Sequence, residues 1–137
     1  MPQATERVGR FGEYFAAAIL SLVSDTVTIV PHNASADIIF EHNLKLYKCQ
    51  VKTQSAIEEC RGNWRFDMRK GQHAKHRQYK NNEIDVFAFV AVPHRNVVFS
   101  KPLDQAQLTI VDEHMKNNDA VKNIKDILKD LDKKNPS

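Results

Sequence analysis

Apolar residues recur along the chain in patterns that predict helices alternating with strands. Over residues 5–23 the spacing is helical, and the second half is apolar on nearly all sides, which indicates burial against a sheet. Alternation with a period of two residues over 36–40 and 47–53 predicts the two strands of a β-hairpin. The almost continuous apolar run over 84–92 predicts a central strand covered on both faces. An amphipathic helix is predicted over 119–133.

Weaker patterns predict the remaining elements of an α/β fold. Short strands are expected over 26–30, 63–68 and 97–100, and a short helix over 72–79. The segment 103–118 is ambiguous. The chain has 137 residues, with no internal repeat and no low-complexity linker. We therefore expect one domain over 1–137, with a core over about 5–100 and a C-terminal helical extension over about 112–133.

The two faces of the predicted hairpin differ in character. One face is apolar throughout, and the other is apolar near the turn and polar at the far end. This pattern predicts a strand pair buried on both faces, with a site cut into one end; the alternative is a solvent-facing polar edge. The apolar face carries Ile38, Phe40, Tyr47, Cys49 and Val51, and the mixed face carries Asp37, Ile39, Leu46, Lys48, Gln50 and Lys52.

The register of the hairpin decides where Asp37 points. If the turn centres on residues 42–43, Asp37 lies opposite Lys48 and shares a face with Gln50 and Lys52. A slip of one residue would send Asp37 to the other face. We expect the first arrangement, in which the three polar side chains form one patch.

This patch has the groups that phosphodiester hydrolysis needs. Mg²⁺ prefers oxygen ligands, and Asp37 can be the main one, with the side-chain carbonyl of Gln50 and the backbone carbonyl of Val51 as neutral ligands. Lys52 can orient or deprotonate the attacking water and offset developing negative charge. The patch therefore predicts a metal-dependent phosphodiesterase site.

A further acid, Glu13, lies on the predicted first helix next to two glycines. Gly9 and Gly12 lie one turn apart, and each costs about 1 kcal/mol of helix stability relative to alanine. Close approach of the helix backbone to the sheet would explain both. Glu13 could then bind the metal directly or through water; the alternative is a solvated surface acid.

Composition excludes membrane-spanning and disulfide-rich classes. Hydrophobic residues make up 42% and charged residues 27%, and no apolar run approaches the roughly 20 residues that cross a bilayer. We see no signal peptide. Cys49 and Cys60 are too few for a disulfide framework, so we expect a reducing, cytoplasmic location, with Cys49 packed and Cys60 in a loop. Close Cys and His pairs that would suggest zinc are absent.

Positive charge is concentrated in one segment. The net charge of +3 and the pI near 8.9 are only mildly basic, but basic residues interleaved with aromatic ones gather over 61–80. Such a segment fits contact with the DNA backbone, whereas the alternative is a solvated loop and helix face. The candidate DNA-binding residues are Arg61, Arg65, Arg69, Lys70, Lys75, Arg77 and Lys80.

Taken in order, these residues resemble the PD-(D/E)XK nuclease superfamily. The matching features are the glycine-flanked Glu13, then Asp37 on a strand, then Q-X-K at 50–52, followed by a strand, a basic stretch and an apolar strand. The resemblance covers about residues 6–92. Ala36 replaces the Pro that names the motif, and Gln50 replaces an acid.

The Gln makes the chain most similar to small intron-encoded homing endonucleases; archaeal Holliday-junction resolvases, which it also resembles, have a Glu there. The resemblance implies a restriction-endonuclease-like αβββαβ core with a mixed sheet flanked by helices, here with a C-terminal amphipathic helix. It implies Mg²⁺, with Mn²⁺ able to substitute, and DNA and a second copy of the chain as partners, in a homodimer or higher homo-oligomer. The implied catalytic set is Glu13, Asp37, Gln50 and Lys52.

Three hypotheses follow. The first is a Mg²⁺-dependent DNA endonuclease, with a site-specific homing enzyme and a Holliday-junction resolvase as its two forms. The second is a DNA-binding relative without catalysis, since Gln50 replaces an acid. The third is an interaction scaffold whose C-terminal helix pairs with a partner.

Overall fold

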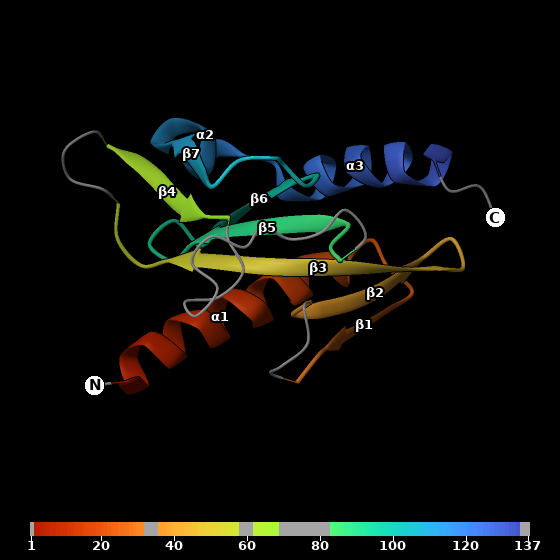
Figure 1. Cartoon of the computed structure of the whole chain (residues 1–137), viewed down its shortest axis with the longest axis horizontal. Helices are drawn as coiled ribbons and strands as arrows, with labels where there is room; N and C mark the ends of the chain where they lie inside the picture. The colour runs from red at the N-terminus through yellow and green to blue at the C-terminus, as the bar shows by residue number, and fades with distance from the viewer. Residues whose placement is uncertain (1, 32–35, 58–61, 69–82, 135–137) are drawn as a thin grey trace.

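The computed structural model describes residues 2–31, 36–57, 62–68 and 83–134. No helix in these ranges is long and apolar enough to cross a membrane. The elements in chain order (Figure 1) are α1 (Pro2–Leu20), β1 (Thr26–Ile29), β2 (Ile38–His42), β3 (Lys45–Gln54), β4 (Asn63–Asp67), β5 (Val86–Ala91), β6 (Asn96–Ser100), β7 (Gln107–Val111), α2 (Asp112–Asn117) and α3 (Ala120–Lys134).

Five strands form a mixed sheet in the order β1-β2-β3-β5-β6. The strands pair antiparallel except for β3 and β5, which run parallel. The parallel pair requires a crossover connection between β3 and β5, as expected for an α/β fold. The predicted strand over 84–92 is therefore confirmed as a central strand, and the predicted mixed sheet is confirmed as well.

Two apolar cores lie on opposite faces of this sheet. The helices α1 and α3 pack on one face, and β4, β7 and α2 cover the other. Because side chains alternate along a strand, β5 supplies both cores, and all six of its residues are buried. Burial on both faces explains why this segment is apolar without interruption.

The strand over 63–68 forms as β4, but it is not part of the five-stranded sheet. It pairs with β7 in a separate two-stranded sheet, beside α2 (Figure 1). The ambiguous segment 103–118 supplies both β7 and α2. The expected helix over 72–79 lies outside the described residues.

The C-terminal helix forms as predicted, and its apolar face is occupied. Ile124, Ile127, Leu128 and Leu131 are buried in the core that α3 shares with the sheet. This face is therefore not available to a partner, which removes the basis for the scaffold hypothesis.

The hairpin turn lies one residue later than predicted. It centres on Asn43 and Leu44, which both have positive φ, 53° and 66°, as a type I′ turn requires. Lys48 therefore pairs with Ile39 and not with Asp37, a shift of two residues. Because faces repeat every two residues, the predicted faces survive the wrong register.

Burial of the hairpin was predicted correctly on one face only. The face that carries Phe40 and Cys49 is buried. On the other face Leu46 is 70% exposed, and Leu44 in the turn is 85% exposed. The prediction of burial on both faces is therefore wrong near the turn. The second apolar core lies under β5 and β6 and leaves this end of the hairpin open.

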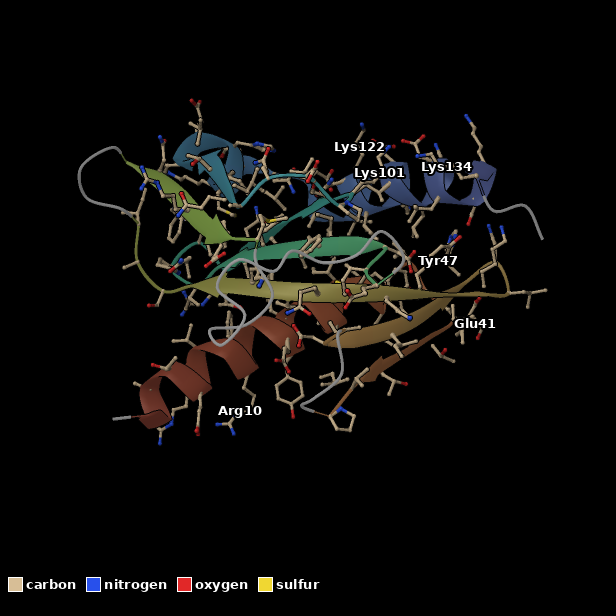
Figure 2. The ribbon with its side chains drawn as sticks, viewed as in Figure 1. Arg10, Glu41, Tyr47, Lys101, Lys122 and Lys134 are labelled. Carbon is tan, nitrogen blue, oxygen red and sulfur yellow. The ribbon has the colours of Figure 1, made fainter. Side chains whose placement is uncertain are left out.

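A cluster around Asp132 attaches the hairpin to α3. Tyr47 Oη and Asn43 Nδ2 each donate a 2.6 Å hydrogen bond to the carboxylate, and His42 Nδ1 lies 3.2 Å from it. Figure 2 shows Tyr47 near the C-terminal end of α3. Burial raises the pKa of Asp132, but the hydrogen bonds from Tyr47 and Asn43, together with the nearby His42 and Lys45, outweigh burial and hold that pKa below its ordinary value.

Replacing Tyr47 by Phe removes one donor to this carboxylate. We expect the free energy of unfolding to fall by about 1.5–3 kcal/mol near neutral pH, the usual contribution of a hydrogen bond to a charged group. A carboxylate with a lowered pKa contributes stability above its unfolded pKa and loses that contribution as the pH falls through the folded value. The difference between Y47F and the wild type should therefore shrink below about pH 4.

Urea unfolding at several pH values measures this difference. Tyr14→Phe is the matched control, because Tyr14 is 60% exposed. Equal effects of the two changes would contradict the role given to Asp132.

Candidate active site

The close contact between α1 and β3 determines where Glu13 lies. A Cβ built on Gly12 would overlap the hydroxyl oxygen of Thr53 and lie 2.9 Å from its Cβ. Only glycine allows the helix this close to the strand. Gly9 has no neighbour within 4 Å of such a Cβ, so the expected close approach is correct for Gly12 and wrong for Gly9.

Asp37 is held by its backbone at the start of β2. Its N–H donates to Cys49 O at 2.9 Å, and its carbonyl accepts from Val30 N–H at 2.8 Å. These two bonds attach the residue to β3 on one side and to the end of β1 on the other. The position of Asp37 is therefore determined by the middle of β3 and by the residue that follows β1.

The Asp37 carboxylate accepts a hydrogen bond from β3 that a neighbouring strand would otherwise accept. Oδ2 accepts a 2.9 Å hydrogen bond from the backbone N–H of Val51. Strand β3 continues to Gln54, whereas β2 begins at Ile38 opposite Cys49, so this stretch of β3 has no β2 partner. The N–H and C=O of one strand residue point to the same side, so the Val51 carbonyl is directed toward the same open edge.

Lys52 lies on β3 beside this edge and is half-buried. Burial lowers its pKa, and the carboxylates of Asp67 and Asp37 act in the opposite direction. The ammonium therefore interacts with an acid just before β2 and with an acid at the end of β4. Gln50 shares the Lys52 face of β3, and the two residues pair in register with Phe87 and Phe89.

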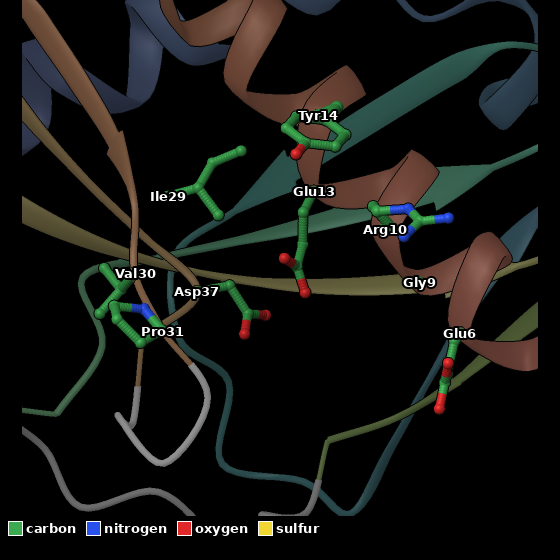
Figure 3. Close-up of a pocket in the computed structure, with 9 residues that line it drawn as sticks. All are labelled: Glu6, Gly9, Arg10, Glu13, Tyr14, Ile29, Val30, Pro31 and Asp37. Atoms are coloured by element: carbon green, nitrogen blue, oxygen red, sulfur yellow. The ribbon is translucent and has the colours of Figure 1, made fainter.

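Glu13 and Asp37 line one pocket of about 610 Å³ between α1 and the ends of β1 and β2. Figure 3 shows both carboxylates directed into the same space. Gln50 and Lys52 are not among the residues that line this pocket. The structure thus brings the two acids together, with Lys52 near Asp37 on the adjoining stretch of β3.

Comparison with known proteins identifies the family. The family model described as PD-(D/E)XK endonuclease matches residues 4–127. The chain belongs to the PD-(D/E)XK endonuclease family. This match extends well past the 6–92 expected from sequence motifs, so the C-terminal elements are part of the family fold. No curated protein matches the chain at a significant level.

Among solved structures, the fold is similar to a bacterial homing endonuclease, I-Ssp6803I. The TM-score is 0.67 at 18% sequence identity, and the alignment covers 97% of this chain and 98% of that one. Identity this low shows a shared fold and no more. The elements of this PD-(D/E)XK chain therefore have counterparts along nearly the whole length of the homing enzyme.

PD-(D/E)XK nucleases generally use divalent metal ions, which must be held by side-chain or backbone groups near the two carboxylates. No three or more His, Cys, Asp or Glu among the described residues are arranged to hold a metal. A metal here would therefore need amide or backbone oxygens beside the carboxylates of Glu13 and Asp37. The side chain of Gln50 and the carbonyl of Val51 are such groups, and an all-oxygen set suits Mg²⁺.

Most of the predicted DNA-binding residues lie outside the described part of this PD-(D/E)XK chain. Arg65 is the exception: it is exposed on β4, and its carbonyl accepts a 2.7 Å hydrogen bond from Gln54 Nε2. The others are Arg61, Arg69, Lys70, Lys75, Arg77 and Lys80, and Cys60 also lies outside. Cys49 is fully buried, as predicted.

Two parts of the site were not recognised in the sequence. Asp67 acts on Lys52 from a different sheet, and pairing between distant segments has no local signal. Arg10 and Tyr14 line the pocket with Glu13. The spacing of three residues between Arg10 and Glu13 was visible and would have been enough to place Arg10 on the same side of α1. Tyr14 follows Glu13 directly, so the same rule groups it with Arg10, four residues earlier.

The contact at Gly12 can be tested by comparing two glycines of one helix. Gly12→Ala should lower the free energy of unfolding by about 1–3 kcal/mol, because the added methyl group forces α1 away from Thr53. Gly9→Ala is the matched control and should raise it by up to about 1 kcal/mol, because alanine favours the helix and meets nothing. Thermal unfolding measures both. If both variants were stabilised, α1 would not lie against β3 as described.

Proposed function

We propose that this PD-(D/E)XK protein is a Mg²⁺-dependent endodeoxyribonuclease that hydrolyses phosphodiester bonds in DNA, with Mn²⁺ able to replace Mg²⁺. The observation that carries the proposal is the position of Asp37. Its carboxylate is hydrogen-bonded to Val51 N–H, shares a pocket with Glu13 and lies near Lys52. The family match supports the reaction class.

Each residue has a proposed role in the reaction. Glu13, Asp37, the Gln50 amide oxygen and the Val51 carbonyl would hold the metal ion. When bound, such an ion supplies positive charge at the phosphate and makes water a stronger nucleophile. The hydrogen bond from Val51 fixes the orientation of the Asp37 carboxylate, so little reorganisation is needed when substrate binds.

Lys52 is proposed to act on the proton of the attacking water and on the negative charge of the phosphate. Burial lowers its pKa, which makes loss of the proton to solvent easier and favours a role in orienting or deprotonating the attacking water. Asp37 and Asp67 oppose that shift and favour the ammonium form, which neutralises charge developing on the phosphate. The pH profile of cleavage would separate the two roles.

A site-specific homing endonuclease is the form of this activity that we favour. The support is the fold shared with a bacterial homing endonuclease over nearly the full length of both chains. Two active sites in one assembly can cut both strands of a duplex in a single binding event, so we propose a homodimer or a higher homo-oligomer. A DNA substrate also fits the proposed cytoplasmic location.

Lys52→Ala should reduce the cleavage rate at least about a hundredfold, because general acid–base groups contribute that much or more. Plasmid, linear duplex and four-way junction DNA, each with and without Mg²⁺, are the substrates. Lys48→Ala is the matched control, because Lys48 is an exposed lysine on the same face of β3. Undiminished cutting by K52A would contradict the proposed site, and preference for the junction would favour a resolvase.

Gln50→Glu tests the proposed metal ligands. A carboxylate binds Mg²⁺ more tightly than a neutral amide, so half-maximal activity should require less Mg²⁺. Calorimetric titration of Mg²⁺ measures affinity independently of cleavage. Gln107→Glu adds the same charge at an exposed position of β7 and should leave the affinity unchanged. Equal affinity in Q50E and the wild type would place the metal away from Gln50.

A further inference from the structure

Among the described residues that line the pocket of Glu13 and Asp37, one is positively charged. That residue is Arg10, and the acids that line the pocket are Glu6, Glu13 and Asp37. A DNA phosphate that approaches these carboxylates is repelled unless positive charge is close by. Arg10 is therefore the side chain of the described pocket best suited to attract a second phosphate.

Arg10 lies at the edge of the pocket and is exposed. Figure 2 shows it projecting outward from α1, and Figure 3 shows its guanidinium directed away from the Glu13 carboxylate. Within the described residues Arg10 forms no ion pair. Its charge is thus not neutralised by the acids of its own helix.

Tyr14 lies on the same side of α1, one turn after Arg10, and lines the same pocket. Its side chain is 60% exposed, so its hydroxyl is accessible to a ligand that approaches from solvent. A tyrosine hydroxyl and an arginine guanidinium are both common donors to DNA phosphates. The two residues together offer a phosphate three or more N–H and O–H donors.

We propose that Arg10 and Tyr14 bind the DNA phosphate next to the one that is cleaved. This inference rests on the proposed nuclease function and adds a substrate contact to it. Arg10 and Glu13 are separated by about 4.5 Å along the helix axis. Successive phosphates of one DNA strand advance about 3.4 Å along the duplex, so a strand that presents one phosphate to Glu13 and Asp37 brings a neighbour within reach of Arg10.

A contact of this kind positions the DNA and carries no sequence information. Replacing Arg10 should therefore weaken the binding of all DNA sequences to a similar extent. It should raise KM with little change in kcat, because the contact exists before and during the reaction. Arg10 and Tyr14 are thus positioning residues and not catalytic ones.

The test measures binding of labelled duplex DNA by anisotropy, with Ca²⁺ in place of Mg²⁺, between about 50 and 200 mM salt. Arg10→Ala should weaken binding roughly tenfold at low salt and reduce the slope of log K against log salt by about 0.9. Arg10→Lys should restore most of the slope. Arg7→Ala is the matched control, because Arg7 is exposed on the same helix but does not line the pocket. Tyr14→Phe should raise KM several-fold at unchanged kcat.

Two outcomes would overturn the inference while leaving the nuclease function intact. One is equal loss of affinity in R7A and R10A, which would indicate a general effect of charge. The other is wild-type binding and KM in R10A together with normal cleavage. A wild-type protein that neither binds nor cuts DNA would overturn both the inference and the function on which it rests.

Discussion

The site depends on the short distance between α1 and β3. Because Gly12 lacks a side chain, the helix backbone lies directly against Thr53, and the next residue, Glu13, reaches the pocket of Asp37. A side chain at position 12 would hold the helix farther from β3 and keep the two carboxylates apart. Gly12 lowers the stability of the helix. The same residue allows the close contact that brings Glu13 of α1 next to Asp37.

The second requirement is an edge of β3 that no strand covers. From Val51 onward β3 extends past the first residue of β2, and the Asp37 carboxylate accepts the exposed N–H in place of a strand carbonyl. A side chain that completes a backbone hydrogen bond in this way is held firmly, because leaving that bond unmade would cost about 1–3 kcal/mol. The hydrogen bond that satisfies the edge of β3 is thus the same bond that orients Asp37, a proposed metal ligand.

The sequence predicted those features that depend on local periodicity. The faces of the hairpin were predicted correctly although its turn was not, because the error of two residues preserves the alternation. Leu44 in a left-handed conformation is uncommon for a branched residue, so composition favoured an earlier turn. The pairing of β4 with β7 was not predictable, since it joins segments about 40 residues apart with no local signal. The same pairing places Asp67 near Lys52.

The balance of charge explains why the site needs residues from so many elements. Two carboxylates at one pocket repel both each other and a DNA phosphate, and this repulsion is strong where water is partly excluded. The proposed metal ion would offset this repulsion, and the amide of Gln50 would add an oxygen ligand without adding negative charge. Arg10 on α1 lines the pocket with the two acids, and Lys52 on β3 interacts with Asp37. Positive charge from these two elements would attract a phosphate backbone to the acids more strongly than either residue would alone.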